Sequence, residues 1–205
     1  MNQLLKYLQR EGVYATLTKV KNKVFKHSKS YTIFLKNNGG GEKRIDSSEN
    51  FEIERLTEVN RKDFERIKFW DFVNTDEFIN NPKQSILLLK VDEEYVAYAA
   101  EEHEICREIH GLGKFQLRFG EGWIGPVYVL RSWRGHGINK ALVAEQVKKL
   151  KAGGIDTFYT SINSNNEASL NSFKHSGFCE IGRVDSKGSV EARSDRVLFE
   201  RFTNN

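Results

Sequence analysis

The sequence predicts a mixed α/β (α+β) fold, in which a mostly antiparallel sheet has one central parallel pair of strands and flanking helices. Apolar runs at Gln84–Val91 and Tyr95–Cys106 flank the turn Asp92–Glu94, which is typical of an antiparallel hairpin. Further along, a helix joins two more apolar runs, Trp123–Leu130 and Ile155–Ile162. A strand–helix–strand unit of this kind predicts a parallel pair.

The N-terminal segment differs in charge from the rest of the chain. Residues 1–30 contain seven lysines and arginines against one glutamate, a net charge of +6, so the other residues sum to −2 within the total of +4. Apolar residues three and four apart over 13–26 predict an amphipathic helix, and 2–10 reads as a second one. We therefore expect a basic helical extension with a loop at 1–49 and the main domain at 50–205.

The basic extension leaves two interpretations open. It makes weak contact with an anionic membrane surface or a partner, or it docks on its own domain with its lysines in water. The main domain is not basic, which argues against nucleic acid as a partner.

The first half of the main domain follows from local patterns. A short β-like run at Tyr31–Leu35 comes before it, and Phe51–Leu56 alternates apolar and charged residues as a half-buried strand does. We expect helices over 58–72 and 76–80, the second closed by the pair Asn81-Pro82.

The region after the hairpin is less regular. Several glycines within Arg107–Glu121 predict a further hairpin tip. Pro126 lies inside the following strand and indicates a bulge or an edge. The helix over Gly137–Lys151 has apolar residues that form no single stripe, so we expect contacts on more than one of its sides.

The last elements have clear boundary signals. Ser164 and Glu167 fit a capping box at the start of a helix, which Gly177 ends. We expect the strand Phe178–Val184 next, with Arg196–Phe202 as its antiparallel partner.

The chain has two cysteines, which are far apart in the sequence, and we expect both as reduced thiols in a cytoplasmic protein. No apolar run approaches the ~18 residues that a membrane span needs. No Cys/His grouping has the spacing of metal ligands, so no metal is predicted.

The stretch Val127–Leu142 has the strongest functional signal. It contains a short apolar run, a turn with Gly135 and Gly137, and the start of a helix. Backbone amides at such a turn, with a helix N-terminus behind them, suit an anion. Arg134 and Lys140 add positive charge, so we predict a phosphate-bearing ligand here.

Two motifs, in this order, resemble the GCN5-related N-acetyltransferase (GNAT) superfamily. Arg134–Leu142 resembles the acyl-CoA pyrophosphate turn, whose pattern is Arg or Gln, two residues, Gly, one residue, then Gly or Ala. Asn166–Phe178 resembles the family's second motif, in which Asn precedes a helix that ends in Gly-Phe. A lone glycine turn is a weak signal, whereas two motifs one strand apart are a stronger one. The resemblance covers 51–202, with its specific content in 125–178.

The resemblance implies acetyl-CoA, or another acyl-CoA, as the donor substrate, with no metal. The pantetheine arm would bond backbone groups of Val127 and Val129 like an additional strand, and Asn166 would bond it from the other side. The residues that the resemblance implies for the donor are Val127, Val129, Arg134, Gly135, His136, Gly137, Ile138, Asn139, Lys140, Asn166, Ser169 and Phe173.

Two positions depart from the family's pattern. Asn139 stands where Gly or Ala is usual, and its side chain either crowds the phosphate or bonds to it. Phe173 stands where many members have a tyrosine that protonates the leaving thiolate. Phenylalanine cannot donate a proton, so another group serves or the thiolate leaves unassisted, which a thiol pKa of ~8.5 tolerates.

The implied reaction is direct transfer of the acyl group to a primary amine. A backbone amide near Val129 would stabilise the developing oxyanion, and a base must take a proton from the acceptor. Alternation along the strand 95–106 puts Glu102 and Glu104 on one face. We take Glu102, Glu104 and Tyr128 as the catalytic candidates.

The sequence therefore predicts an acyl-CoA-dependent N-acetyltransferase, with a nucleotide-linked amino sugar or another small amine as acceptor. The alternatives are a protein N-terminal or lysine acetyltransferase, and a non-catalytic acyl-CoA-binding module. The expected partners are acyl-CoA and the amine, with a homodimer left open.

Overall fold

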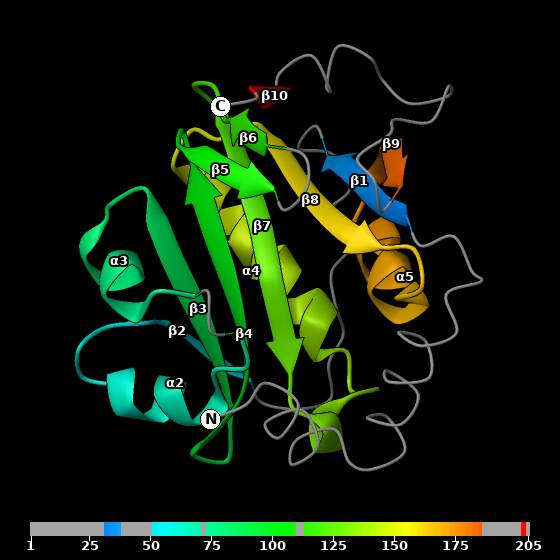
Figure 1. Cartoon of the computed structure of the whole chain (residues 1–205). Coiled ribbons are helices and arrows are strands. Elements are labelled where there is room, and N and C mark those ends of the chain that lie inside the picture. Colours follow the sequence, from blue (N-terminus) through cyan, green and yellow to red (C-terminus); the bar gives the residue numbers. More distant parts are fainter. Residues whose placement is uncertain (1–30, 38–50, 71–72, 110–112, 186–201, 204–205) are drawn as a thin grey trace.

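The computed structural model describes residues 31–37, 51–70, 73–109, 113–185 and 202–203, and the fold below concerns these ranges. A seven-stranded sheet forms the centre of the molecule, in the order β2-β3-β4-β7-β8-β1-β9 (Figure 1). Its strands are β1 (Tyr31–Asn37), β2 (Glu52–Arg55), β3 (Gln84–Val91), β4 (Glu94–His103), β7 (Glu121–Val129), β8 (Thr157–Asn163) and β9 (Cys179–Asp185).

Every neighbouring pair in this sheet is antiparallel except β7 and β8, which are parallel. Helix α4 (Ile138–Ala152) joins the two parallel strands. The predicted mixed sheet with one parallel β-α-β unit is therefore confirmed. The bulge or edge expected at Pro126 is a bulge, because the register of β4 on β7 shifts there.

The two faces of the sheet are covered by different elements. Helices α2 (Arg61–Ile67) and α3 (Thr75–Asn80) pack on one face around Tyr98. Helices α4 and α5 (Glu167–His175) pack on the other face. Helix α2 is shorter than the predicted 58–72.

A small second sheet lies over the same face as α2 and α3 (Figure 1). Phe115 of this sheet and Leu117, which follows it, pack onto Trp123 of β7. The hairpin expected within residues 107–121 is present as the antiparallel pair β5 (Cys106–Ile109) and β6 (Gly113–Gln116). The predicted strand 95–106 instead divides, since β4 ends at His103. The strands of this second sheet are β5 (Cys106–Ile109), β6 (Gly113–Gln116) and β10 (Phe202–Thr203).

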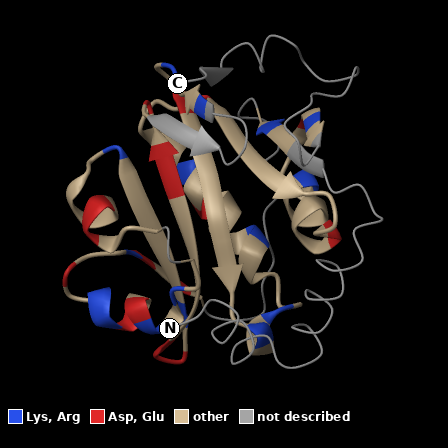
Figure 2. Cartoon of the chain, in the orientation of Figure 1, with Lys and Arg blue, Asp and Glu red and all other residues tan. Residues whose placement is uncertain are grey.

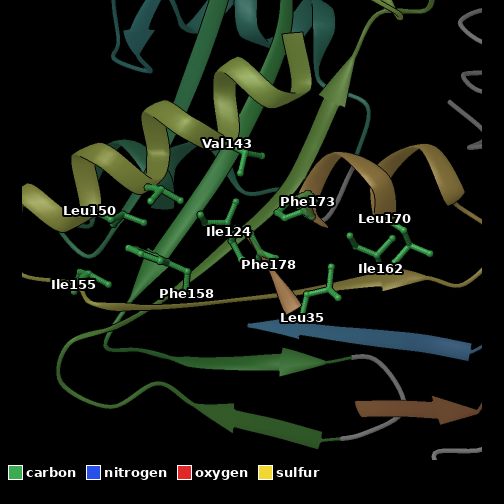
Figure 3. Close-up of a cluster of buried hydrophobic side chains, with 11 residues drawn as sticks. Leu35, Ile124, Val143, Leu150, Ile155, Phe158, Ile162, Leu170, Phe173 and Phe178 are labelled. Carbon is green, nitrogen blue, oxygen red and sulfur yellow. The ribbon is translucent and has the colours of Figure 1, made fainter. Parts of the chain in front are cut away.

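Helix α4 contacts two groups of buried side chains, as its irregular apolar pattern predicted. Ile138 and Leu142 pack against β3 and β4, whereas Val143 and Val147 pack with residues of β1, β7, β8 and α5. Figure 3 shows this second group, in which side chains from the helices and the sheet point toward one another. The two-sided contact fixes α4 on the sheet.

Strand β1 lies inside the sheet, between β8 and β9, and is antiparallel to both. Its Phe34 and Leu35 are fully buried on opposite faces. The boundary expected at residue 49 therefore does not separate this strand from the sheet. The helices predicted at 2–10 and 13–26 lie outside the described residues.

The predicted pairing of Arg196–Phe202 with Phe178–Val184 is not what the described residues show. The neighbour of β9 in the sheet is β1. Of the segment 196–202 only Phe202 is described, and it pairs with Phe115 of β6.

Candidate functional site

Strands β7 and β8 diverge from a common starting point. In the described chain they pair at Glu121–Trp123 with Thr157–Tyr159 and no further, and beyond Trp123 they separate (Figure 1). The Leu130 amide donates to the Val96 carbonyl of β4 at 2.8 Å, so Leu130 faces β4. By alternation, the backbone groups of Val127 and Val129 face the diverging side.

A bulge marks the place where the two strands separate. Ala99 pairs with Val127 and Glu101 with Ile124, so Gly125 and Pro126 together stand opposite Ala100. Proline has no N–H to offer the Ala100 carbonyl. That carbonyl instead accepts a hydrogen bond of 2.9 Å from Nε2 of Gln146 on α4, whose side chain is fully buried. Sequence reasoning missed Gln146, a polar residue among the buried positions of α4.

The turn after β7 has the backbone that its glycines predict. Gly135 has φ +93° and Gly137, the N-cap of α4, has φ +79°, conformations that L side chains rarely adopt. A Cβ built at either glycine would meet nothing within 4 Å. The glycines are therefore required by backbone conformation, and the space beside them is open.

The N-terminus of α4 offers, beside this open space, amides that have no partner among the described residues. The first amide that bonds within the helix is that of Ala141, which donates to the Gly137 carbonyl at 3.1 Å. The amides of Ile138, Asn139 and Lys140 precede it at the positive end of the helix dipole. The first turn contains no acidic residue, and Lys and Arg cluster around it (Figure 2). The turn is thus suited to an anion.

The side chains of the turn differ in what they contact. Arg134 is exposed and folds back along β7, where its Nε donates to the Val129 carbonyl at 3.1 Å and its guanidinium carbon lies 5.8 Å from the centre of the Tyr128 ring. His136 is exposed, and its ring meets that of Trp133 edge-on at 5.9 Å. Oδ1 of the half-buried Asn139 has no hydrogen-bond partner among the described residues.

The second motif opens and closes helix α5. Its N-cap is Asn166, whose Oδ1 accepts from the Ser169 amide at 3.3 Å, so the capping box predicted at Ser164 is wrong. The Asn166 side chain is exposed. Phe173 is buried in the core and meets Phe178 edge-to-face at 5.0 Å (Figure 3).

The three catalytic candidates occupy different environments. Glu102 and Tyr128 are both buried and lie on the face of the sheet that α2 and α3 cover. Glu104 follows the end of β4 with φ +54°, so strand alternation does not extend to it. Its carboxylate contacts Nζ of Lys83 at 3.4 Å. The expectation that alternation relates Glu102 to Glu104 therefore fails at the strand end.

The segment after α2 is held over Tyr128 by aromatic contacts. The Phe69 ring stacks on Tyr128 at 4.8 Å and 6°. The hydroxyl of Tyr98 accepts from the backbone amides of Phe69 and Trp70 at 3.2 and 3.4 Å. These contacts place aromatic groups beside the strands that bear Glu102 and Tyr128.

A buried acceptor group lies next to Glu102. Gln84 of β3 is the cross-strand partner of Glu102, and its side chain is 5% exposed. Oε1 of Gln84 has no hydrogen-bond partner among the described residues. The pattern of the sequence did not single out Gln84, because its position depends on the pairing of β3 with β4.

Glu101 belongs to the opposite face and to a different network. Its carboxylate accepts from Nζ of Lys149 on α4 at 3.0 Å and from the Ser85 hydroxyl. Lys149 also donates to Ser85 at 3.0 Å. These contacts join α4 to β3 and β4.

A diverging parallel pair beside a glycine turn and a helix N-terminus defines a protein that can hold an extended ligand with an anionic end. Residues 50–178 match the Acetyltransferase (GNAT) family, and the chain belongs to that family. It is an acetyltransferase by family membership. The comparison with curated proteins found no match.

Solved structures share the fold at low sequence identity. A GNAT-family protein from Novosphingobium aromaticivorans aligns with a TM-score of 0.53 and 13% identity over 74% of this chain and 60% of its own length. The aminoglycoside N-acetyltransferase AAC(6')-Iy in complex with CoA aligns with a TM-score of 0.52 and 15% identity, over 63% of this chain and 92% of its own length. The same enzyme in complex with a bisubstrate analogue aligns with a TM-score of 0.52 and 16% identity, over 64% of this chain and 92% of its own length.

Among the described residues, no group of three or more His, Cys, Asp and Glu side chains is placed to hold a metal ion. The helices described here include none with the length and apolar character needed to cross a membrane.

Proposed function

We propose that this protein transfers an acetyl group from acetyl-CoA to a primary amine on a small molecule, by direct attack of the amine on the thioester. The divergence of β7 from β8 beside the Gly135–Gly137 turn carries this proposal. It combines an edge of β7 that pairs with no described strand beyond Trp123, which suits an extended pantetheine arm, with a helix N-terminus that suits an anion.

The residues of the turn fit the pyrophosphate of the donor. The space beside Gly135 and Gly137 is open, and the first amides of α4 adjoin it. Arg134, His136 and Lys140 supply cationic or donor side chains, and the amide nitrogen of Asn139 is a further donor. The side-chain amide of Asn166 is exposed at the start of α5 and suits the arm from its other side.

Few backbone amides of β7 can stabilise the oxyanion, because the bulge reduces the number of N–H donors on the diverging side. Pro126 has no N–H, and Tyr128 faces β4 by alternation. Val127 and Val129 face the diverging side, and we assign the oxyanion contact to one of their amides.

Glu102 is our candidate base. Together with Oε1 of Gln84 it presents acceptors on adjacent strands of one face, an arrangement that suits an ammonium or amine, which donates hydrogen bonds. Glu102 takes the proton, the amine nitrogen bonds to the carbonyl carbon, and the carbon–sulfur bond breaks. The thiolate departs with the electron pair and is protonated afterwards, since Phe173 has no proton to give.

The acceptor class follows from these groups and from the aromatic rings near them. Buried acceptors on the sheet face that also carries Phe69 and Tyr128 suit a cationic amine on a compact molecule. An amino sugar, free or linked to a nucleotide, is the first class to test. AAC(6')-Iy, with which this chain shares the fold, is an aminoglycoside N-acetyltransferase, so aminoglycosides belong in the same panel.

The test is thiol release from acetyl-CoA with a panel of amino sugars, aminoglycosides, polyamines and peptide N-termini. With the best acceptor, Glu102→Gln should lower kcat about 100-fold and leave the KM for acetyl-CoA unchanged, because a general base contributes roughly that factor. Glu104→Gln is the matched comparison, and a loss confined to that variant would transfer the role of base to Glu104.

A non-catalytic acyl-CoA-binding module is the second candidate, and Phe173 at the usual tyrosine position favours it. It predicts binding of acetyl-CoA with no thiol release for any amine. Release above the rate without enzyme, with any member of the panel, would exclude it.

A further inference from the structure

Arg134 occupies a position that the proposed donor would need. Its Nε donates to the Val129 carbonyl, one of the two residues of β7 whose backbone groups face the diverging side. A pantetheine amide that bonds this carbonyl as an added strand would meets Nε of Arg134 at the same oxygen. The arginine thus competes with the arm for the same acceptor.

The pyrophosphate offers Arg134 a stronger partner. Arg134 directly precedes Gly135, so its side chain starts at the edge of the anion site. A guanidinium–phosphate bond joins two charged groups and can be bidentate, so it is stronger than the bond from the same guanidinium to a neutral carbonyl. A donor with a pyrophosphate therefore compensates for the displacement of Arg134, whereas a donor that lacks phosphate does not.

We propose that Arg134 makes the enzyme selective for thioesters of complete CoA over thioesters of pantetheine, because its hydrogen bond occupies the Val129 carbonyl until an anion displaces the side chain. This inference rests on the donor site proposed above and adds to it a specificity-determining residue. A thioester of pantetheine must break the contact between Arg134 and Val129 and has no phosphate to replace it, which is the source of the selectivity.

The test measures the dissociation constants of acetyl-CoA and of S-acetylpantetheine, by calorimetry and by thermal-shift titration. For Arg134→Ala, the Kd of acetyl-CoA should rise about tenfold, since a charged hydrogen bond is lost. The Kd of S-acetylpantetheine should fall about threefold, since no side chain then occupies the Val129 carbonyl. A single change then moves the two affinities in opposite directions.

Lys140→Ala is the matched control in the same anion site. No hydrogen bond from Lys140 to β7 is present in the described structure. Loss of the Lys140 side chain should therefore raise the Kd of acetyl-CoA and leave the Kd of S-acetylpantetheine unchanged. Arg134 is exposed and Lys140 is half-buried. Circular dichroism and Tm are the checks that both variants fold.

Unchanged or weaker binding of S-acetylpantetheine by Arg134→Ala would overturn the proposed role of Arg134. Tight binding of acetyl-CoA by the wild type would still support the proposed donor site. If the wild type does not bind acetyl-CoA, the donor site itself fails, and the inference fails with it.

Discussion

Gln146 illustrates how one side chain determines the geometry of the site. The bulge at Gly125–Pro126 leaves the Ala100 carbonyl without a donor from β7, and Nε2 of Gln146 supplies it from the helix. The contact is fully buried, so water cannot replace it. Gln146 thereby supports the bulge at which β7 leaves β8.

Replacing Gln146 by Glu keeps the shape and exchanges the donor for an acceptor. At pH 7 the buried carboxylate and the unpaired Ala100 carbonyl should lower the free energy of unfolding by about 2 kcal/mol or more. Burial raises the pKa of such a carboxyl, so the folded variant binds a proton that the unfolded chain releases. The loss should therefore shrink as the pH falls toward 4 and grow as it rises.

Urea unfolding between pH 4 and pH 8 measures this dependence. Gln146→Met is the control, because it removes the donor without adding a titrating group. This account of Gln146 would be contradicted if the difference in the free energy of unfolding between the Glu variant and the Met variant were the same at all pH values.

At the scale of elements, the attachment of α4 to the sheet decides where its N-terminus points. Lys149 near the end of the helix reaches Glu101 and Ser85, whereas Ile138 and Leu142 near its start pack on β3 and β4. The helix is thus fixed at both ends. The turn before its N-terminus is positioned accordingly.

The Lys149–Glu101 contact should contribute to stability because the glutamate is buried. The side chain of Glu101 is 4% exposed. Among the described residues, Lys149→Met leaves its carboxylate with the Ser85 hydroxyl alone. We expect a loss of about 2 kcal/mol in the free energy of unfolding. Lys148→Met, one residue earlier, removes an ion pair to Glu145 from a lysine that is 71% exposed and should cost less than about 0.5 kcal/mol. Equal losses in chemical denaturation would show that burial does not distinguish the two pairs.

Element boundaries show where local patterns were insufficient. Ser164 and Glu167 have the spacing of a capping box, yet the chain turns two residues later and Asn166 caps α5. Strand β4 ends at His103 because the chain there turns toward β5. In both places a turn of the backbone, which the spacing of the residues does not reveal, sets the end of the element.

At the scale of the whole molecule, the matched family segment and the complete sheet are not the same unit. The match covers 50–178, whereas β1, at residues 31–37, pairs with both β8 and β9. Without β1, these two strands lose their common neighbour and the core loses Phe34 and Leu35.

A fragment of residues 50–205 should therefore fail to unfold cooperatively, because removal of two buried side chains of this size costs several kcal/mol and the sheet is interrupted as well. A fragment of residues 31–205 retains β1 and is the matched control. Thermal unfolding followed by circular dichroism compares them. A cooperative transition of the shorter fragment close to that of the longer one would show that β1 is dispensable.

The sequence by itself determined the mixed sheet with its parallel β-α-β unit and the glycine turn before α4, and it limited Pro126 to a bulge or an edge. These features depend on local periodicity and on backbone conformations that few residues can adopt. Only the tertiary structure decided that β1 lies between β8 and β9, that Gln146 completes the bulge, and that Gln84 adjoins Glu102. Such relations join residues far apart in the chain, and strand order and register, which bring them together, arise from the packing of the whole core rather than from any local pattern.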